Sequence, residues 1–515
     1  MHRPAQLQAQ PPRLLYASVA FVASVVLWGL LSPASLGAAA SAALSFTTRS
    51  FGWFYLWTVL GVVAFCLFLA FSRFGALRLG GEDAEPEFPA HAWFAMLFAA
   101  GMGIGLVFWG AAEPLSHYVA PPPGIAPASA EAANAAMRYA FFHWGLHPWA
   151  IYTVVALAIA YFQSKGGSGF NFSATLSGLG VRPAARWLGI IDLFAVVATA
   201  FGVATSLGLG ALQINSGLHA VFGFPVGVAS QLAIIAVTTA LFLASALSGI
   251  ERGIKWLSTT NIILASLLAA AVFVLGPTGA ILDTFTSTLG AYLSELVRMS
   301  LRLTPFRDTT WVADWTIFYW AWWLSWSPFV GLFIARVSKG RTVREFVAGT
   351  LALPSLACFA WFSVFGGTAL HLEIFSQASL AAAAEADVST AIFRLFDRLP
   401  ASGLLSAAAT LVVVIFFVTS ADSATVVLSM LSSRGDPSPP RRLNLVWGVL
   451  VSLVAMSLLL AGGLKAIQTA AIVAALPFAA VVILLCVSLY RGLDEEWRSR
   501  ERAERELRQR LRKKD

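Results

Sequence analysis

Residues 101–110 read GMGIGLVFWG, which places three glycines within five positions of an otherwise apolar segment. Each glycine weakens an α-helix by about 1 kcal/mol relative to alanine, so we expect the backbone to unwind here. A second unusual segment, residues 311–331, holds six tryptophans and then Pro328 and Gly331, which also permit a broken helix. Two interrupted segments about five spans apart are typical of inverted-repeat transporters with a midplane site. Glycine for close helix packing is the alternative.

The composition of the chain indicates a membrane as its solvent. Of 515 residues, 58% are hydrophobic and only 12% are charged. The apolar residues come in runs of about 20, the length needed to cross a hydrocarbon core of about 30 Å as an α-helix. About twelve such runs occur, the first over residues 14–31 and the second from near Trp53. The chain is therefore predicted to be an all-α membrane protein with about 12 transmembrane helices.

The basic residues predict the orientation of the chain. The net charge is +8, but the 34 Lys and Arg residues are segregated by loop rather than gathered on one surface, which argues against nucleic-acid binding. With a cytoplasmic N-terminus, the outer segments contain only Arg49, Arg138, Arg298, Arg302, Arg307, Arg394, Arg398 and Lys465. This bias predicts a multi-pass protein of the bacterial inner (plasma) membrane with both termini in the cytoplasm.

Aromatic residues recur at helical spacing in two of the predicted spans. They are Trp144, Trp149 and Tyr152 in the fourth span, within an arc of about 140°, and Trp320, Trp323 and Trp326 in the eighth. Trp and Tyr usually anchor helices at the membrane interface, but most of these residues are expected deeper in their spans. Aromatic faces bind quaternary ammonium through cation–π attraction, so we predict a ligand cage, with packing as the alternative.

Few polar groups lie within the apolar runs. Thr419 and Ser420 offer hydroxyl oxygens, and an unwound backbone near Met102 would offer carbonyls, a combination that suits a hard ion such as sodium. Hydroxyl groups in membrane helices also bond to backbone, which is the alternative role.

Three acids within spans are functional candidates by default. Glu113 precedes Pro114 near a helix end and is interpreted as structural, whereas the roles of Asp192 and Asp422 stay open. The sequence shows no recognisable metal cluster, nucleophile–base pair or phosphate loop. It therefore predicts no enzymatic activity and no cofactor.

Four motifs resemble those of the betaine/choline/carnitine transporter (BCCT) family. They are residues 101–105 with Phe108-Trp109-Gly110 and Glu113-Pro114, His143-Trp144 with residues 147–152, residues 315–329, and residues 419–423. They occur in order and at compatible spacing over nearly the whole chain. The resemblance implies a leucine-transporter-like fold of two inverted five-helix repeats, usually a homotrimer, and sodium-coupled uptake of a trimethylammonium compatible solute such as glycine betaine.

The resemblance also implies a role for each motif residue. Trp144, Trp149, Tyr152 and Trp323 would enclose the ammonium group, beside Gly101, Met102, Gly103 and Gly105, while Trp326 would meet the carboxylate. Trp322 and Trp320 would line the inner and outer paths. Sodium would bind backbone at Ala99, Met102 and Phe416 and the side chains of Thr419 and Ser420. A second sodium site would use Thr199, Ser206, Asn261 and Phe329, although Val203 stands where a threonine is expected.

Two positions favour sodium symport of a zwitterion within the family. Choline-specialised members carry an acid where this chain has Gly105, and sodium-independent exchangers carry an arginine where it has Ile262. A proton-coupled choline importer, with an acid such as Asp192 as proton carrier, is the alternative in the same class. Channel-like release of osmolytes is the alternative from another class.

The expected organisation is a single integral membrane domain over residues 1–515. Its parts are a cytoplasmic N-terminus (1–14), two preamble helices (15–90), a first inverted repeat (91–280), an amphipathic connecting helix (281–308), a second inverted repeat (309–490) and a basic cytoplasmic tail (491–515). The charged tail is expected either to be solvated or to dock on anionic lipid headgroups. Its short length makes osmotic activation a hypothesis only.

Overall fold

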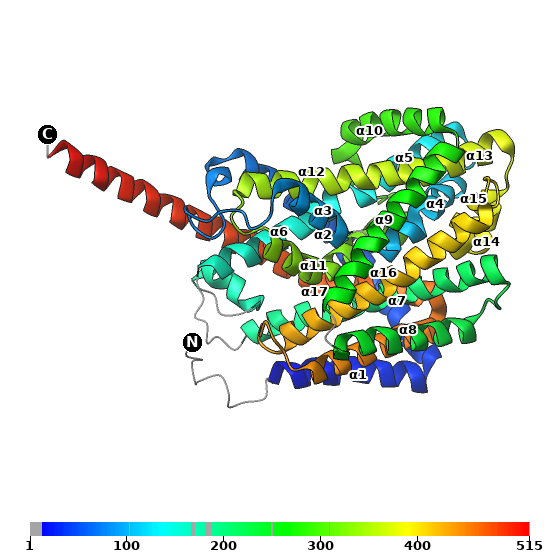
Figure 1. The fold of residues 1–515 in the computed structure, drawn as a ribbon, viewed down its shortest axis with the longest axis horizontal. Coiled ribbons are helices and arrows are strands. Elements are labelled where there is room, and N and C mark those ends of the chain that lie inside the picture. The colour runs from blue at the N-terminus through cyan, green and yellow to red at the C-terminus, as the bar shows by residue number, and fades with distance from the viewer. Residues whose placement is uncertain are drawn as a thin grey trace.

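The computed structural model describes residues 13–101, 103–165, 170–180, 187–248, 251–307 and 309–513. These residues form helices, with one isolated β-bridge between Arg78 and Thr342 (Figure 1). The α-helices are α1 (Arg13–Leu31), α2 (Pro33–Phe71), α3 (Ala90–Gly101), α4 (Ile104–Val119), α5 (Ala130–Trp144), α6 (Leu146–Ser164), α7 (Leu188–Phe222), α8 (Val228–Ser248), α9 (Glu251–Leu275), α10 (Thr278–Ser300), α11 (Phe318–Val337), α12 (Val343–Phe362), α13 (Thr368–Ser376), α14 (Leu380–Ala386), α15 (Ala391–Phe396), α16 (Ser402–Ser432) and α17 (Arg441–Arg512). Short 3₁₀ turns are η1 (Arg73–Ala76), η2 (Ser173–Leu179) and η5 (Val388–Thr390), and π-helical turns are η3 (Ala313–Ile317) and η4 (Ser363–Gly367).

Ten helical segments among the described residues are long and apolar enough to cross a membrane. One of them, α17, has non-helical backbone at Gly462 and Gly463, so its 72 residues are two helices joined at a kink. The short helices α3 and α4 together form one further, interrupted segment. The all-helical, multi-pass fold is confirmed, while the count of 12 spans stays a prediction.

The second helix is longer than the sequence indicated. We expected it to begin near Trp53, but α2 runs for 39 residues from Pro33. Proline is favoured at the first position of a helix, and the alanine-rich stretch that follows has high helix propensity. The first helix, α1, covers the predicted residues.

The two expected interruptions have different outcomes. Helix α3 ends at Gly101 and α4 begins at Ile104, with Gly103 in extended backbone, so the interruption expected from the glycines is present. The break expected at Pro328 and Gly331 is wrong, because α11 is continuous through both residues.

Local contacts explain why α11 does not break. Pro328 cannot donate to the carbonyl of Leu324, but Ser327 Oγ donates to that oxygen at 2.7 Å. A Cβ on Gly331 would stand 2.6 Å from Val155 Cγ1, so this glycine allows α11 to pack closely on α6. The irregular turn of this segment is the π-helical turn η3, which precedes α11.

The fourth span is divided where we expected one helix. Helix α5 ends at Trp144 and α6 begins at Leu146, with Gly145 in non-helical backbone between them. A Cβ on Gly145 would lie 2.6 Å from the carbonyl oxygen of Phe141, so only glycine fits this bend. The arc predicted for Trp144, Trp149 and Tyr152 assumed one uninterrupted helix and is therefore wrong, although the bend still brings the three side chains to one region.

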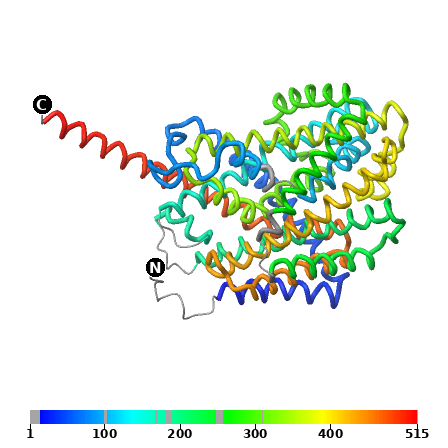
Figure 2. The backbone as a smooth tube through the Cα atoms, viewed as in Figure 1, coloured from blue at the N-terminus to red at the C-terminus, as the bar shows by residue number. Residues whose placement is uncertain are grey.

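Helix α11 lies at the centre of the packing that forms the site, against α6, α7 and α17. Helix α10 lies at the edge of the bundle (Figure 1), buries Tyr292 and Met299 and exposes Leu293 and Val297, as an amphipathic helix does. The end of α17 extends beyond the helical body (Figure 2).

Candidate functional site

Four aromatic side chains from three helices form one buried cluster, which we call the cage: Trp144 of α5, Trp149 and Tyr152 of α6, and Trp323 of α11. The ring centroids of Trp144 and Trp323 lie 4.8 Å apart, those of Tyr152 and Trp323 6.3 Å, and those of Trp149 and Tyr152 5.6 Å. All three pairs meet edge to face, and each side chain is 7% exposed or less. An ammonium cage binds its ligand through ring faces, and three helices bring these four buried rings to one region of the bundle.

The two tryptophans assigned to the transport paths lie in different surroundings. Trp322 stacks on Trp323 with centroids 4.9 Å apart, and its Nε1 donates to Ser206 Oγ at 3.3 Å. Trp320 instead stacks on His147 at 5.0 Å and is fully buried, with its Nε1 unpartnered. Trp322 therefore supports the cage wall, whereas Trp320 belongs to the packing behind it.

Gly105 lies where the indoles of Trp322 and Trp144 converge. A Cβ at this position would stand 2.4 Å from Trp322 Cη2 and 3.1 Å from Trp144 Cη2. Any side chain here would displace Trp322, so the glycine is required by this arrangement of the rings.

Glu113 of α4 binds the cage residue Trp144 and the residues next to it. Its Oε2 accepts hydrogen bonds from Trp144 Nε1 at 2.8 Å and from the Tyr319 hydroxyl at 2.5 Å. Its Oε1 lies 2.7 Å from His143 Nδ1 and 3.3 Å from His117 Nε2. The carboxyl group is fully buried, and it joins α4 to α5 and α11. Glu113 is structural, as interpreted from the sequence, but it acts on a cage residue directly.

Sequence reasoning singled out Trp144 among the partners of Glu113, but it gave no role to His117, His143 or Tyr319. His143 also pairs its Nε2 with Thr316 Oγ1 at 3.0 Å, and Tyr319 stacks on His143 with centroids 4.6 Å apart. A signal was available, because His143 and Tyr319 lie inside two of the quoted motifs and are polar residues in apolar runs. What the sequence did not show is that they meet one carboxylate from a third helix.

Glu113, His117 and His143 together are a set of groups that could hold a metal ion, with ligand atoms within 4.8 Å of one another. The sequence analysis expected no such cluster. Hydrogen bonds already engage both carboxylate oxygens, so the group is accounted for without an ion. The same bonds are the ones that orient Trp144 and Tyr319.

A second, polar cavity lies between α9, α11 and α16 and has a volume of about 370 Å³. Its lining brings together residues of both predicted sodium sites, with Trp326 and two charged residues: Gly103, Asn261, Ile262, Trp326, Phe329, Arg336, Phe416, Thr419, Ser420 and Asp422. We call it the cation cavity. Thr419 Oγ1 donates to the carbonyl of Ile415 at 2.8 Å, which leaves its lone pairs available.

Asp422 lies in this cavity one helical turn beyond Thr419. Its side chain is almost fully buried, and its Oδ1 accepts no hydrogen bond. Asp192 differs, because its Oδ1 accepts from the backbone N–H of Ser173 at 2.9 Å and so anchors η2 on α7. Asp422 is therefore the intramembrane acid with an available oxygen.

The remaining predicted ion ligands are placed as follows. Ala99 lies in α3, and Met102 lies outside the described residues. Thr199 and Ser206 lie on α7 and do not line the cation cavity, and Thr199 Oγ1 donates to the carbonyl of Ala195 at 2.7 Å. Asn261 and Phe329, the other two residues predicted for the second site, do line the cavity.

Trp326 connects the cage helix to the cation cavity. Its Nε1 donates to the carbonyl of Gly202 at 2.9 Å, and its ring meets Phe329 edge to face at 5.3 Å. The half-buried ring lines the cavity, while the N–H that was expected to meet a carboxylate is engaged with α7 in this conformation.

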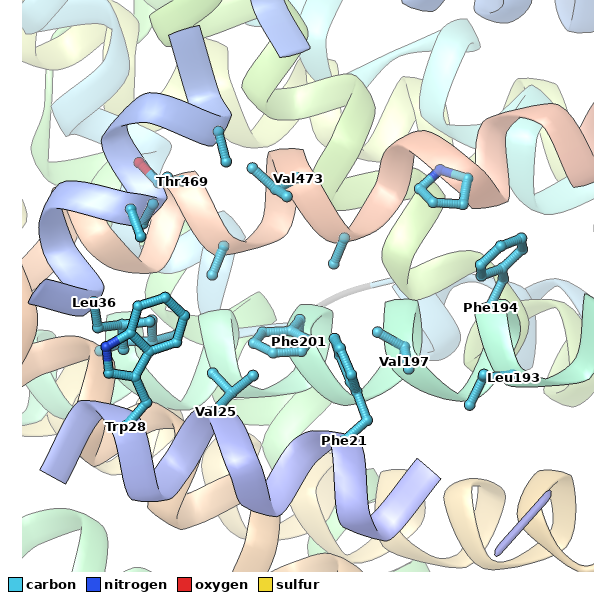
Figure 3. Close-up of a pocket in the computed structure, with 17 residues that line it drawn as sticks. Phe21, Val25, Trp28, Leu36, Leu193, Phe194, Val197, Phe201, Thr469 and Val473 are labelled. Atoms are coloured by element: carbon cyan, nitrogen blue, oxygen red, sulfur yellow. The ribbon is translucent and has the colours of Figure 1, made fainter. Parts of the chain in front are cut away.

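A separate cavity of about 440 Å³ lies under α1 and is almost entirely hydrocarbon. Figure 3 shows Phe21, Val25, Trp28 and Phe201 around this space, which α1, α2, α7 and α17 enclose. None of its lining residues is charged, and none belongs to the predicted site. A zwitterion would lose its hydration there without replacement, so this cavity is not the substrate site.

The helical fold, the buried cage and the adjoining polar cavity define a multi-pass membrane transporter for a small solute. A family model described as "BCCT, betaine/carnitine/choline family transporter" matches residues 13–498, and the chain belongs to this family. It is 49% identical to "Glycine betaine transporter OpuD" of Bacillus subtilis (strain 168), over 95% of both chains. It is 44% identical to the "Ectoine/hydroxyectoine transporter" of Virgibacillus pantothenticus, over 94% of this chain and 96% of that one. It is 42% identical to "Glycine betaine transporter 1" of Vibrio parahaemolyticus, over 87% and 86% of the two chains.

Proposed function

We propose that this transporter couples sodium entry to uptake of glycine betaine or a closely related zwitterion by alternating access. The observation that carries the proposal is the adjacency of the cage and the cation cavity on α11, with Trp323 in one and Trp326 in the other. Two of the relatives are named glycine betaine transporters, which supports this choice of solute.

The cage favours a quaternary ammonium over a primary one. A trimethylammonium group has no N–H to satisfy, so it loses little when water is excluded and gains about 0.5 to 2 kcal/mol from each cation–π contact. A primary ammonium would lose hydrogen bonds to water that aromatic faces do not replace. Burial of all four rings supports a dry site of this kind.

Gly105 argues for a zwitterion rather than choline. An acid at this position would partner a substrate that has no carboxylate of its own, but its Cβ would lie 2.4 Å from Trp322. This geometry supports a substrate that brings its own carboxylate.

Sodium is the coupling ion of the proposal, held by Thr419, Ser420 and backbone of Ala99, Met102 and Phe416. The cation cavity supports it, since its α16 wall offers the hydroxyl oxygens of Thr419 and Ser420 and the free Asp422 oxygen. Ile262 also lines this cavity, so the position where exchangers carry an arginine holds an apolar side chain here. We propose that at least one sodium ion is coupled, bound at the site of Thr419 and Ser420, whose side chains line the cation cavity.

The arrangement in the cell is part of the same proposal. We place the transporter in the inner membrane of a bacterium as a homotrimer, with two inverted repeats and both termini cytoplasmic. The basic residues of the tail support this orientation, and the tail would lie near anionic headgroups.

The deciding experiment is uptake of labelled glycine betaine into proteoliposomes under an inward sodium gradient or an equal potassium gradient. Accumulation with sodium alone is expected. Uptake that is indifferent to sodium but follows a proton gradient would favour proton coupling, and flux without accumulation would favour a channel. Ectoine belongs in the same assay as a competitor, because one relative is named for it.

A further inference from the structure

An arginine-lined cavity of about 570 Å³ lies between the loop after α4, helix α5, the last turns of α10 and the segment that follows α10. Its lining includes Arg138, Arg298, Arg302 and Arg307. They are four of the eight basic residues in the segments predicted to lie on the outer side of the membrane. Because Lys and Arg are disfavoured on that side, their convergence on one cavity calls for a cause other than topology.

The cavity wall is held in place by hydrogen bonds. Arg302 donates from Nη1 to the Tyr139 hydroxyl at 3.2 Å and from Nη2 to the carbonyl of Pro123 at 2.6 Å. It thereby ties the end of α10 to α5 and to the loop after α4. The Arg307 side chain packs against Gly124, where the loop turns with a φ of +100°. A Cβ on Gly124 would stand 3.3 Å from Arg307 Nη1. The site is thus preformed.

Carboxylates balance only part of the positive charge in this cavity. Glu131 and Glu295 also line it, and Glu295 pairs with Arg298 at 3.4 Å. Within the described ranges, Arg138, Arg302 and Arg307 form no ion pair at 4.0 Å or less. Two positive charges therefore remain in excess in a confined space, which repel one another until an anion enters.

Arg138 also lacks a hydrogen-bond acceptor inside the protein. Its Nε is buried and has no hydrogen-bond partner. A buried guanidinium N–H without an acceptor is costly, and an anion in the cavity would supply that acceptor.

We propose that this cavity binds a phosphate group, namely the phosphodiester of an anionic phospholipid headgroup. Guanidinium groups bind phosphate oxygens in bidentate geometry, and several of them here face one space. The rim favours a lipid over a free ion, because Leu303 and Phe306 stand 43% and 98% exposed beside the arginines. Exposed apolar side chains next to basic ones are typical of a protein surface that lies at the membrane interface.

The test is native mass spectrometry of the full-length transporter in detergent, titrated with phosphatidylglycerol, phosphatidylcholine or inorganic phosphate. The variant Arg138→Gln/Arg307→Gln removes the two cavity arginines whose side chains make no ion pair and no hydrogen bond within the described residues. The matched control is Arg49→Gln/Arg394→Gln, which removes two exposed outer arginines that do not line the cavity. Melting temperatures of both variants show that each is folded, and single Arg307→Gln serves if the double variant is not.

The expected result is a preference for phosphatidylglycerol over phosphatidylcholine that falls about tenfold in the cavity variant and is unchanged in the control. Full displacement of the lipid by millimolar inorganic phosphate, with no advantage for the lipid, would keep the anion site but overturn the lipid as its source. Equal binding of both lipids, or equal losses in the two variants, would overturn the proposal.

Discussion

Glu113 and Asp422 are both carboxyl groups inside apolar helices, but their surroundings are opposite. Glu113 is in contact with four donors from neighbouring side chains at 2.5 to 3.3 Å. Asp422 keeps one buried oxygen without any partner and lines a cavity. Because removing a carboxyl group from water is costly, a complete set of partners indicates a scaffold and an incomplete set indicates a missing ligand. Two buried acids can therefore have opposite surroundings, one with all its partners and one without.

Removing the Glu113 carboxyl group should have the largest effect. Glu113→Ala leaves Trp144, Tyr319 and two histidines without their acceptor, and loss of one member of a buried charged network costs about 3–5 kcal/mol. Thermal unfolding in detergent measures this loss. Glu113→Gln, which keeps one acceptor, should fold better yet still show a raised KM for glycine betaine. An unchanged KM in the folded Gln variant would show that the hydrogen bonds to Glu113 do not affect substrate binding by the cage.

Cage substitutions should act on binding more than on folding. Trp323→Leu or Trp149→Leu is expected to cost about 1 to 2 kcal/mol of binding, roughly five- to thirtyfold in affinity. Substrate binding followed by calorimetry gives the value. Trp320→Leu is the matched control, since Trp320 lies on the same helix but packs on His147 outside the cage. Equal losses of affinity at all three positions would refute the cage.

Asp422→Asn should leave stability unchanged, because Oδ1 has no partner to lose. A unit charge about 6 Å from the hydroxyl pair contributes about 0.7 kcal/mol in water and more in a confined cavity. The half-saturating sodium concentration should therefore rise about three- to tenfold. Asp192→Asn, which lies outside the cation cavity, should leave sodium dependence as it is. If the melting temperature of Asp422→Asn fell as far as that of Glu113→Ala, Asp422 would also be a structural residue.

A carboxylate at the protein surface should show the smallest effect. Glu496, near the start of the tail, lies 2.9 Å from Lys165 Nζ and 2.6 Å from Arg500 Nη2. Partial burial acts to raise the pKa of Glu496, but the hydrogen bonds from Lys165 and Arg500 outweigh it and hold the pKa below its ordinary value of 4.5. The stabilisation is thus complete above about pH 4.5 and is lost as the pH falls through the lowered pKa.

The tail prediction has a direct measurement. Spin labels on Ser164→Cys and Glu504→Cys report the distance between the tail and the end of α6. Glu496→Gln should broaden that distance distribution by loosening a contact worth no more than about 1 kcal/mol. Glu501→Gln is the control, since the one ion pair that Glu501 forms among the described residues is with Arg505 of its own helix, at 3.7 Å. Equal broadening in both variants would mean that Glu496 does not attach the tail.

Much of the fold could be predicted because it depends on segment length and polarity. Apolar runs of about 20 residues predict membrane helices whatever their neighbours are. The bends could not be predicted in the same way. Gly145 interrupts a helix where carbonyl and ring atoms approach it, whereas Pro328 does not, because Ser327 bonds the carbonyl that the proline leaves free.

The residue types that form the cage could be predicted, but which of the tryptophans belong to it could not. Trp320, Trp323 and Trp326 are related by steps of three residues, each of which turns the helix by about 60° short of a full rotation. Over two steps this carries the side chain from the packing at His147 to the cage and then to the cation cavity. Glu113 was assigned too small a role because three of its four partners, His143, Trp144 and Tyr319, come from other helices, and spacing along one helix does not contain such long-range contacts.

Gly105 has a consequence for how this site can change over generations. With Trp322 only 2.4 Å from an added Cβ, a single substitution at residue 105 disturbs the cage before it can offer a new substrate any charge. A shift toward a cationic solute through an acid at residue 105 therefore requires the Trp322 ring to move as well. The close approach of one glycine and one indole links the choice of substrate to the position of a ring that is not itself part of the cage.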